Sequence, residues 1–268
     1  MTNDERQMTN DLLLAIGFLT VLPVQTPAPQ PGGLGRAGRW FPTVGLILGV
    51  VLATAHFLLS QLFSPLLTAA LVVALWAALT GGLHLDGLAD CCDGLFAAVS
   101  PERRLEIMRD PRLGAFGALG LTLFLILKIL AVASLSSSSF IFHPWPFVLG
   151  PSSLFLLPSS SFLLAPSLAR WLILLVARQP SARPGGLGAD FALGLTWKVF
   201  ILAALVPLAL ILLGGWRALI AAVLAHLVVF VVVRVARARL GGVTGDVLGL
   251  TVELTELTVL LVFIAQVP

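Results

Sequence analysis

Long apolar stretches dominate this chain and alternate with short polar loops. The apolar runs cover residues 43–63, 66–83, 115–134, 162–177, 197–213, 217–233 and 246–266. Each is close to the roughly 20 residues that an α-helix needs to cross the hydrocarbon core of a bilayer. The pattern therefore predicts an all-α protein, a polytopic bundle of helices within a membrane.

Two further apolar segments differ from these runs. Residues 12–24 are short for a span and end near Pro23, which favours a short, tilted or re-entrant helix. Residues 140–157 are rich in Pro and Ser and fit a hairpin or a partial span. Together the segments predict about seven or eight membrane helices. They form a single domain over residues 1–268, with no room for a sizeable soluble module.

Composition excludes a soluble domain. Apolar residues make up 58% of the chain and charged residues 11%, whereas a soluble domain carries about 25% charged residues. The net charge of +3 is better explained by basic cytoplasmic loops than by nucleic-acid binding, so no nucleic-acid partner is expected. The two cysteines, Cys91 and Cys92, are too few for a disulfide framework or a thiolate zinc site.

Charge is distributed unevenly among the loops. The loops at 25–42, 84–114, 178–198 and 234–245 hold most of the Lys and Arg residues, whereas the intervening loops hold none. The positive-inside rule places the basic loops in the cytoplasm, as in a multi-pass protein of the bacterial cytoplasmic membrane. After Asp11, every Asp and Glu also lies in or beside these loops. Chemistry on charged substrates is therefore expected at the cytoplasmic face.

The first motif with chemical potential is the acidic stretch from His84 to Gly94, directly after an apolar run. Asp86, Asp90 and Asp93 are spaced i, i+4 and i+7, so they share one face of a helix. Carboxylates this close repel one another unless a cation neutralises them, and Mg²⁺ prefers oxygen ligands. The spacing therefore indicates an acidic metal site.

One other interpretation applies to the carboxylates of this stretch. Acidic residues also favour helix N-termini, where they are simply solvated. The location at the end of an apolar run argues for the metal site, because ionisable groups at membrane depth are costly. His84 fits three roles: a metal ligand, a general base for a hydroxyl, or a hydrogen-bonded residue at the membrane boundary.

A second stretch, residues 241–249, is rich in glycine and leads into a helix that carries further acids. Asp246 is the better candidate for a second-helix metal ligand. Glu253 and Glu256 lie deeper and are either supporting groups or structural partners. The glycines fit either a phosphate cradle at a helix N-terminus or a tight turn between spans.

Basic residues offer candidate phosphate contacts. In residues 101–114 most arginines are explained by a positive-inside loop helix, and Arg109 and Arg112, nearest the next apolar run, are the better candidates for clamping phosphate oxygens. Lys128 and Arg170 lie inside apolar runs. Such residues pair with acids, bind an anionic substrate or snorkel to the interface.

The run from 81 to 117 resembles cobalamin synthases, the adenosylcobinamide-GDP ribazoletransferase family. Supporting matches occur in the expected order at 18–24, 40–49, 182–188 and 241–249, so the resemblance covers almost the whole chain. Two positions depart from the pattern: Val21 replaces a basic residue and Val243 replaces a Gln.

The resemblance implies that alpha-ribazole, or its 5′-phosphate, attacks adenosylcobinamide-GDP and releases GMP in the last stage of cobalamin nucleotide-loop assembly. It also implies Mg²⁺ as the cofactor and an active site that faces the cytoplasm. The expected catalytic residues are Asp86, Asp90, Asp93 and His84, and the expected metal ligands are Asp86, Asp90, Asp93 and Asp246. The expected substrate-binding residues are Arg109, Arg112, Arg183, Gly242, Thr244 and Gly245.

Two alternative functions were weighed against this one. A CDP-alcohol phosphotransferase has a loosely similar spaced-Asp motif, but Asp90 follows Ala89 where that motif carries Arg. An ion-coupled transporter would place its acids near the bilayer midplane, whereas here they gather at one face. The expected partners are the two substrates and the lipid bilayer, and the sequence is compatible with a homo-oligomer.

Overall fold

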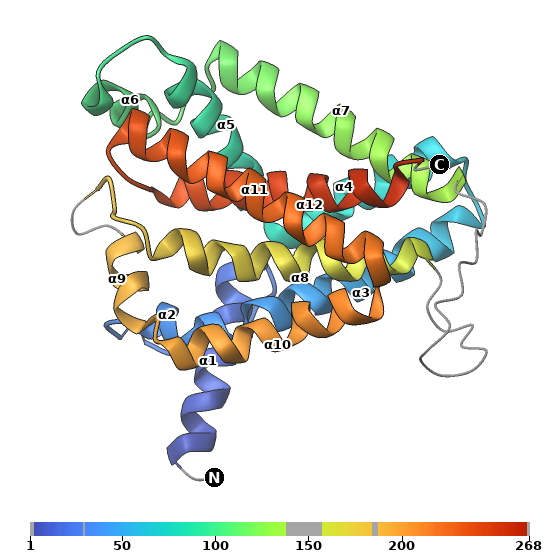
Figure 1. Cartoon of the computed structure of the whole chain (residues 1–268), viewed down its shortest axis with the longest axis horizontal. Helices are drawn as coiled ribbons and strands as arrows, with labels where there is room; N and C mark the ends of the chain where they lie inside the picture. The colour runs from blue at the N-terminus through green and yellow to red at the C-terminus, as the bar shows by residue number, and fades with distance from the viewer. Residues whose placement is uncertain (1–2, 29, 138–156, 184–186, 267–268) are drawn as a thin grey trace.

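A computed structural model describes residues 3–28, 30–137, 157–183 and 187–266, and within these ranges the protein is all-α (Figure 1). The only β-pairing in the described parts is an isolated bridge between Ser181 and Val243. The helices are α1 (Asn3–Leu19), α2 (Gly33–Ala37), η1 (Gly38–Trp40), α3 (Phe41–Ser60), α4 (Pro65–Thr80), α5 (Leu83–Phe96), α6 (Pro101–Ile107), α7 (Ala115–Ser137), α8 (Leu157–Ala177), α9 (Leu187–Gly194), α10 (Trp197–Leu213), α11 (Gly215–Leu240) and α12 (Gly245–Ile264).

Helices α8 and α12 form the centre of the bundle. Their most apolar windows are 78% and 67% buried, compared with 28–33% for the windows in α3, α7 and α11. The outer helices expose rows of large apolar side chains, such as Leu119, Leu123 and Ile126 on α7. Water does not tolerate such surfaces, so these faces indicate contact with lipid and a multi-pass membrane protein.

The described residues contain fewer helices of spanning length than the sequence pattern predicted. Among them, five helices are long and apolar enough to cross a membrane, and α4 with α5 makes a sixth only if this bent pair counts as one span. Helix α10, with 17 residues, is shorter. The predicted number of seven or eight is therefore not confirmed. The stretch at 140–157 lies almost entirely outside the described residues.

The bend between α4 and α5 follows from two glycines. Gly81 and Gly82 have φ angles of 62° and 68°, the left-handed region that residues with a Cβ rarely adopt. The first ends α4 and the second begins α5, and the two helices differ in direction by 92°. The apolar run predicted at 66–83 is thus a shorter helix followed by a sharp turn at Gly81 and Gly82, which we call the elbow. Hydropathy alone does not detect this turn.

Close approach of backbones holds α3 against α8. A Cβ at Gly45 would lie 2.4 Å from the Pro166 carbonyl oxygen, and one at Gly49 would lie 2.3 Å from the Phe162 carbonyl oxygen. The two glycines are four residues apart on one helix face, the small-residue spacing that lets membrane helices pack closely. This contact fixes the central helix α8 in the bundle.

The short helices α2, α6 and α9 gather at one end of the bundle with the loop between α11 and α12 (Figure 1). The α3–α4 and α10–α11 connections and the C-terminus lie at the opposite end. The loops expected to be charged therefore share one end. Helix α1 begins at Asn3, earlier than the expected segment, and its buried Asp11 pairs with Arg39 at 2.5 Å, which ties the middle of the helix to the bundle.

Candidate active site

Helices α5 and α12 cross in direct contact at two glycines. A Cβ at Gly87 would lie 2.8 Å from the Asp246 carbonyl oxygen, and one at Gly249 would lie 3.1 Å from the His84 carbonyl oxygen. Only residues without a Cβ allow the backbones to approach this closely. The two acidic stretches, far apart in the sequence, therefore meet at this crossing.

Four carboxylates lie around the crossing, and we call them the acidic face: Asp86, Asp90, Asp93 and Asp246. Asp86 is exposed and the other three are partly buried. Asp90 lies on α5, outside the five long spans. Burial, the largest cause, and the nearby negative charges of Asp86, Asp246 and Asp93 together raise the pKa of the Asp90 carboxyl to about 7, although Arg183 acts to lower it. Repulsion between like charges therefore adds to the effect of burial at Asp90.

The Asp93 carboxylate binds backbone N–H groups at the start of α7. Its two carboxylate oxygens accept hydrogen bonds from the backbone N–H groups of Gly114 and Gly117, each at 2.8 Å. A Cβ at either glycine would lie 2.3 Å from an Asp93 oxygen, so a side chain at either position would displace the Asp93 carboxylate. Asp93 therefore anchors the N-terminus of α7 to α5, a role that helical spacing along α5 does not reveal.

Asp246 lies at the start of α12 and has two polar neighbours. Its carboxylate is 3.3 Å from an Arg183 guanidinium nitrogen and accepts a hydrogen bond from the Thr244 hydroxyl at 3.2 Å. The same hydroxyl caps α12 by accepting the Val247 N–H. The predicted residues Arg183 and Thr244 are thus in direct contact with a predicted metal ligand.

Arg183 reaches Asp246 because two loops pair side by side. The Val243 N–H donates to the Pro180 carbonyl, and the Ala182 N–H donates to the Val243 carbonyl, both at 2.9 Å. A Cβ at Gly242 would lie 2.5 Å from the Pro180 carbonyl oxygen. Gly242 therefore serves loop pairing here, whereas a Cβ at Gly245 would have no neighbour within 4 Å.

The other predicted phosphate contacts lie in the loop before α7. Arg112 is exposed and forms an ion pair with Asp110 at 2.6 Å. This pairing holds the pKa of the Asp110 carboxyl down at about 2. Arg109 is also exposed. Neither arginine is an electrostatic neighbour of Asp90 or Asp246, whereas Arg183 is one for both.

Metal ligation at the acidic face is less complete than the sequence predicted. Within the described ranges, no three Asp, Glu, His or Cys side chains converge closely enough to hold a metal ion by themselves. Mg²⁺ commonly binds through one or two carboxylates and completes its shell with water and substrate phosphates. The oxygen donors of the acidic face fit a site of this kind, in which water and substrate phosphates supply the remaining ligands.

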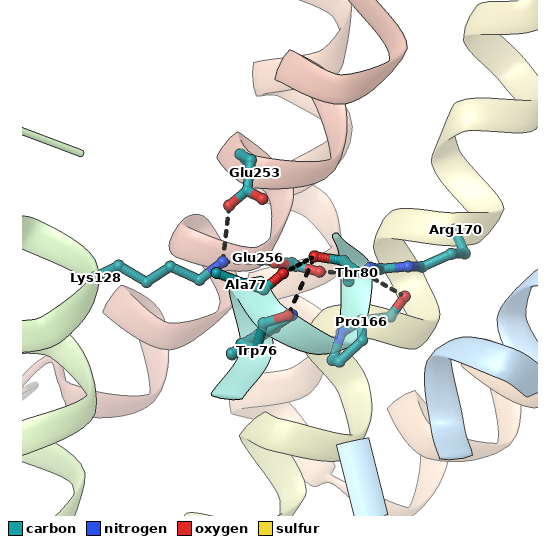
Figure 2. A network of polar contacts seen from close by, with 8 residues as sticks. All are labelled: Trp76, Ala77, Thr80, Lys128, Pro166, Arg170, Glu253 and Glu256. Carbon is teal, nitrogen blue, oxygen red and sulfur yellow. Dashed lines mark hydrogen bonds and ion pairs between the residues drawn. The ribbon is translucent and has the colours of Figure 1, made fainter. Parts of the chain in front are cut away.

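A second set of charged residues lies in the interior of the bundle, and we call it the buried network: Lys128, Arg170, Glu253 and Glu256. The Lys128 ammonium is 2.7 Å from both Glu253 and Glu256, and Arg170 pairs with the other oxygen of Glu256. All four side chains are at most 4% exposed. Figure 2 shows Glu256 of α12 between Lys128 of α7 and Arg170 of α8. The two intramembrane cations therefore pair with acids, one of the roles weighed for them.

His84 belongs to the buried network rather than to the acidic face. It is 4% exposed, and its electrostatic neighbours are Arg170, Glu256 and Lys128. Its Nε2 atom is buried without a hydrogen-bond partner among the described residues. Lys128 also lies over the ring of Trp76, 4.1 Å from its centroid. His84 is therefore a buried residue beside the network, and its expected catalytic role stays a prediction.

Two arginines stabilise the far end of α5, and the sequence analysis did not identify them. Arg104 donates to the Leu95 carbonyl at 2.8 Å, and Arg239 donates to the same oxygen at 3.2 Å. Cations at a helix C-terminus satisfy its free carbonyls and favour its dipole. The sequence shows arginines in two separate basic loops. That both of them bind the Leu95 carbonyl is visible only in the three-dimensional structure.

Comparisons with known proteins cover nearly the whole chain. The profile of the cobalamin-5-phosphate synthase family matches residues 11–264. An adenosylcobinamide-GDP ribazoletransferase from Ectopseudomonas mendocina is 41% identical, covering 92% of this chain and 96% of the relative. Enzymes of the same name from Pseudomonas aeruginosa and Desulfitobacterium hafniense are 43% and 38% identical, covering 95% and 93% of this chain and 98% and 94% of their own lengths. No solved structure matches the chain. The chain belongs to the cobalamin-5-phosphate synthase family.

Proposed function

We propose that this protein completes the nucleotide loop of cobalamin. A hydroxyl of alpha-ribazole, or of its 5′-phosphate, attacks the phosphorus that carries adenosylcobinamide in adenosylcobinamide-GDP. A phosphorus–oxygen bond to the ribazole forms, the bond to GMP breaks, and the hydroxyl proton is released. Family membership and relatives named for this reaction, aligned over almost their full lengths, support the proposal.

The observation that carries the proposal is the meeting of α5 and α12 carboxylates beside Arg183. Phosphoryl transfer requires positioned groups that neutralise charge on the phosphates. Arg183 lies 3.3 Å from Asp246 and supplies a planar cation suited to phosphate oxygens. The N-terminus of α12, a helix of 20 residues, begins at the same point and favours anions.

Mg²⁺ is the cofactor that this donor set suits. One or two of the carboxylates Asp86, Asp90 and Asp246 would hold it, with phosphate oxygens of the donor substrate as further ligands. When bound, the ion supplies charge neutralisation for the GMP leaving group. Asp93 keeps the start of α7 in place through Gly114 and Gly117. A carboxylate of the acidic face, rather than the buried His84, accepts the hydroxyl proton.

The acidic face lies at the end of the bundle that carries the basic loops. We place this end in the cytoplasm of a bacterial cell, because the positive-inside rule orients basic loops inward and nucleotide substrates are cytoplasmic. The rival transporter and CDP-alcohol phosphotransferase functions have no comparable support from the relatives.

The direct test is GMP release by purified protein in detergent, supplied with adenosylcobinamide-GDP, alpha-ribazole and Mg²⁺. We expect EDTA to abolish turnover and Asp86→Asn or Asp246→Asn to lower it about 100-fold or more, as loss of a group that stabilises transition-state charge does. Activity should return when Mg²⁺ is restored to the wild-type protein.

The matched control is Glu106→Gln, which neutralises an acid that is 62% exposed and paired only with Arg103 of its own helix. It should retain wild-type turnover. Full activity of Asp86→Asn would remove the acidic face from the mechanism, and folded wild-type protein that releases no GMP would contradict the proposed reaction itself.

A further inference from the structure

A cavity of about 560 Å³, open to the surface of the bundle, lies next to the acidic face. Its walls come from the α4–α5 elbow, the first half of α5 and the first half of α7. The residues that define its character are Gly82, Leu85, Asp86, Ala89, Leu121 and Leu125. A volume of this size is within the range of small-molecule sites.

The fold builds this cavity in a simple way. The elbow turns α5 away from α4, and a Cβ at Gly82 would have no neighbour within 4 Å, so the inside of the bend stays open. On the other side, α7 approaches α5 closely: a Cβ at Gly117 would lie 3.0 Å from the Ala89 carbonyl oxygen. Leu121 and Leu125 follow on successive turns of α7 and close the wall.

The chemistry of the walls is apolar except at one point. Leucines line most of the cavity, and Asp86 is the only charged side chain among its lining residues in the described part of the chain. Asp86 also belongs to the acidic face, since it is an electrostatic neighbour of Asp90 and Asp246. The cavity and the acidic face therefore share one carboxylate.

The apolar lining and the single carboxylate of the cavity suit some parts of the two substrates better than others. Guanine carries hydrogen-bonding groups along much of its edge, and a leucine-lined cavity with one carboxylate would leave several of them unpaired, which disfavours binding. A corrin ring carries many amide groups, which leucine walls would likewise leave unpaired. The base of ribazole is a flat, dimethylated benzimidazole, which matches apolar walls, and its ribose carries hydroxyl donors for a carboxylate.

We propose that this cavity binds the benzimidazole base of the acceptor nucleoside and that Asp86 accepts a hydrogen bond from its ribose. The inference rests on the proposed function and adds the location of the acceptor. The bound base lies between α5 and α7, and the ribose extends toward the acidic face. The apolar walls select the benzimidazole base, and the Asp86 carboxylate orients the ribose hydroxyl.

The test compares Leu121→Trp, which fills the cavity, with Leu123→Trp on the same helix. Leu123 is 52% exposed and does not line the cavity. We expect Leu121→Trp to raise the KM for alpha-ribazole about tenfold or more, as loss of an apolar pocket contact does, with the KM for adenosylcobinamide-GDP unchanged. Leu123→Trp should leave both values unchanged. Calorimetric titration with alpha-ribazole alone should show the same difference in affinity without depending on turnover.

Two outcomes would contradict the inference. Equal KM values for ribazole in the two Trp variants would show that the cavity does not bind the acceptor, and a raised KM for the GDP substrate alone would assign it to the donor. If Leu121→Trp does not fold, Leu121→Ala provides the test, because a larger cavity should favour an acceptor with a bulkier naphthimidazole base. Wild-type protein that neither turns over nor binds ribazole would instead contradict the proposed function.

Discussion

Two sets of charged residues share helix α12 but differ in charge balance. The buried network combines two cations with two carboxylates, all at most 4% exposed and all paired. The acidic face combines four carboxylates, and the cation Arg183 pairs with one of them, Asp246. A site whose charges balance has little affinity for a further ion, whereas excess negative charge creates an affinity for cations. The comparison therefore predicts a structural role for the first set and a chemical role for the second.

The largest expected effect is on the buried network. Glu256→Gln would leave Lys128 and Arg170 with one carboxylate, and breaking a buried pair in this way costs about 3–5 kcal/mol of unfolding free energy. Reversible unfolding in mixed detergent micelles measures this loss. Removing both Arg170 and Glu256, each replaced by Met, keeps the Lys128–Glu253 pair and should recover most of it. The exposed variant Glu106→Gln is the control, and an equal effect of both single variants would refute a structural role for the network.

A smaller effect distinguishes packing near the acidic face from packing elsewhere. Gly87→Ala and Gly49→Ala both insert a Cβ against a backbone carbonyl, at 2.8 Å from Asp246 and 2.3 Å from Phe162 respectively. Overpacking should cost each variant about 1–3 kcal/mol of unfolding free energy. Only Gly87→Ala moves α5 relative to Asp246, so only this variant should lower kcat per folded molecule. Equal kcat values in the two variants would mean that this crossing does not set the catalytic geometry.

The sequence predicted the helices well but missed the turns between them. The apolar runs at 115–134 and 197–213 correspond closely to α7 and α10, because lipid-facing helices are apolar along their whole length. The elbow at Gly81 and Gly82 interrupts no apolar pattern, so the run at 66–83 concealed it. Loop pairing around Val243 depends on a segment about sixty residues away, and no local pattern encodes it.

The residue types at the site were predicted better than their contacts. Helical spacing correctly placed Asp86 and Asp90 near one another, and the chain brings Asp246 to them. Spacing could not show that Asp93 binds backbone amides of α7 or that His84 points into the bundle. Those outcomes depend on which neighbouring helix packs against each face. A one-dimensional pattern gives the face of a helix, but not the partner it meets.

The smallest expected effect has the opposite sign to the largest. Asp90 is partly buried beside like charges, so Asp90→Asn removes repulsion and should raise the unfolding free energy by about 1 kcal/mol in Mg²⁺-free buffer, as replacements at strained functional sites often do. The same variant should lower GMP release, whereas Glu106→Gln should change neither quantity. Adding Mg²⁺ should then stabilise the wild-type protein more than Asp90→Asn, because the ion compensates the repulsion that the variant has already removed. Destabilisation of Asp90→Asn without Mg²⁺ would mean that this carboxylate is internally compensated, and the contrast between the two charged sets would fail.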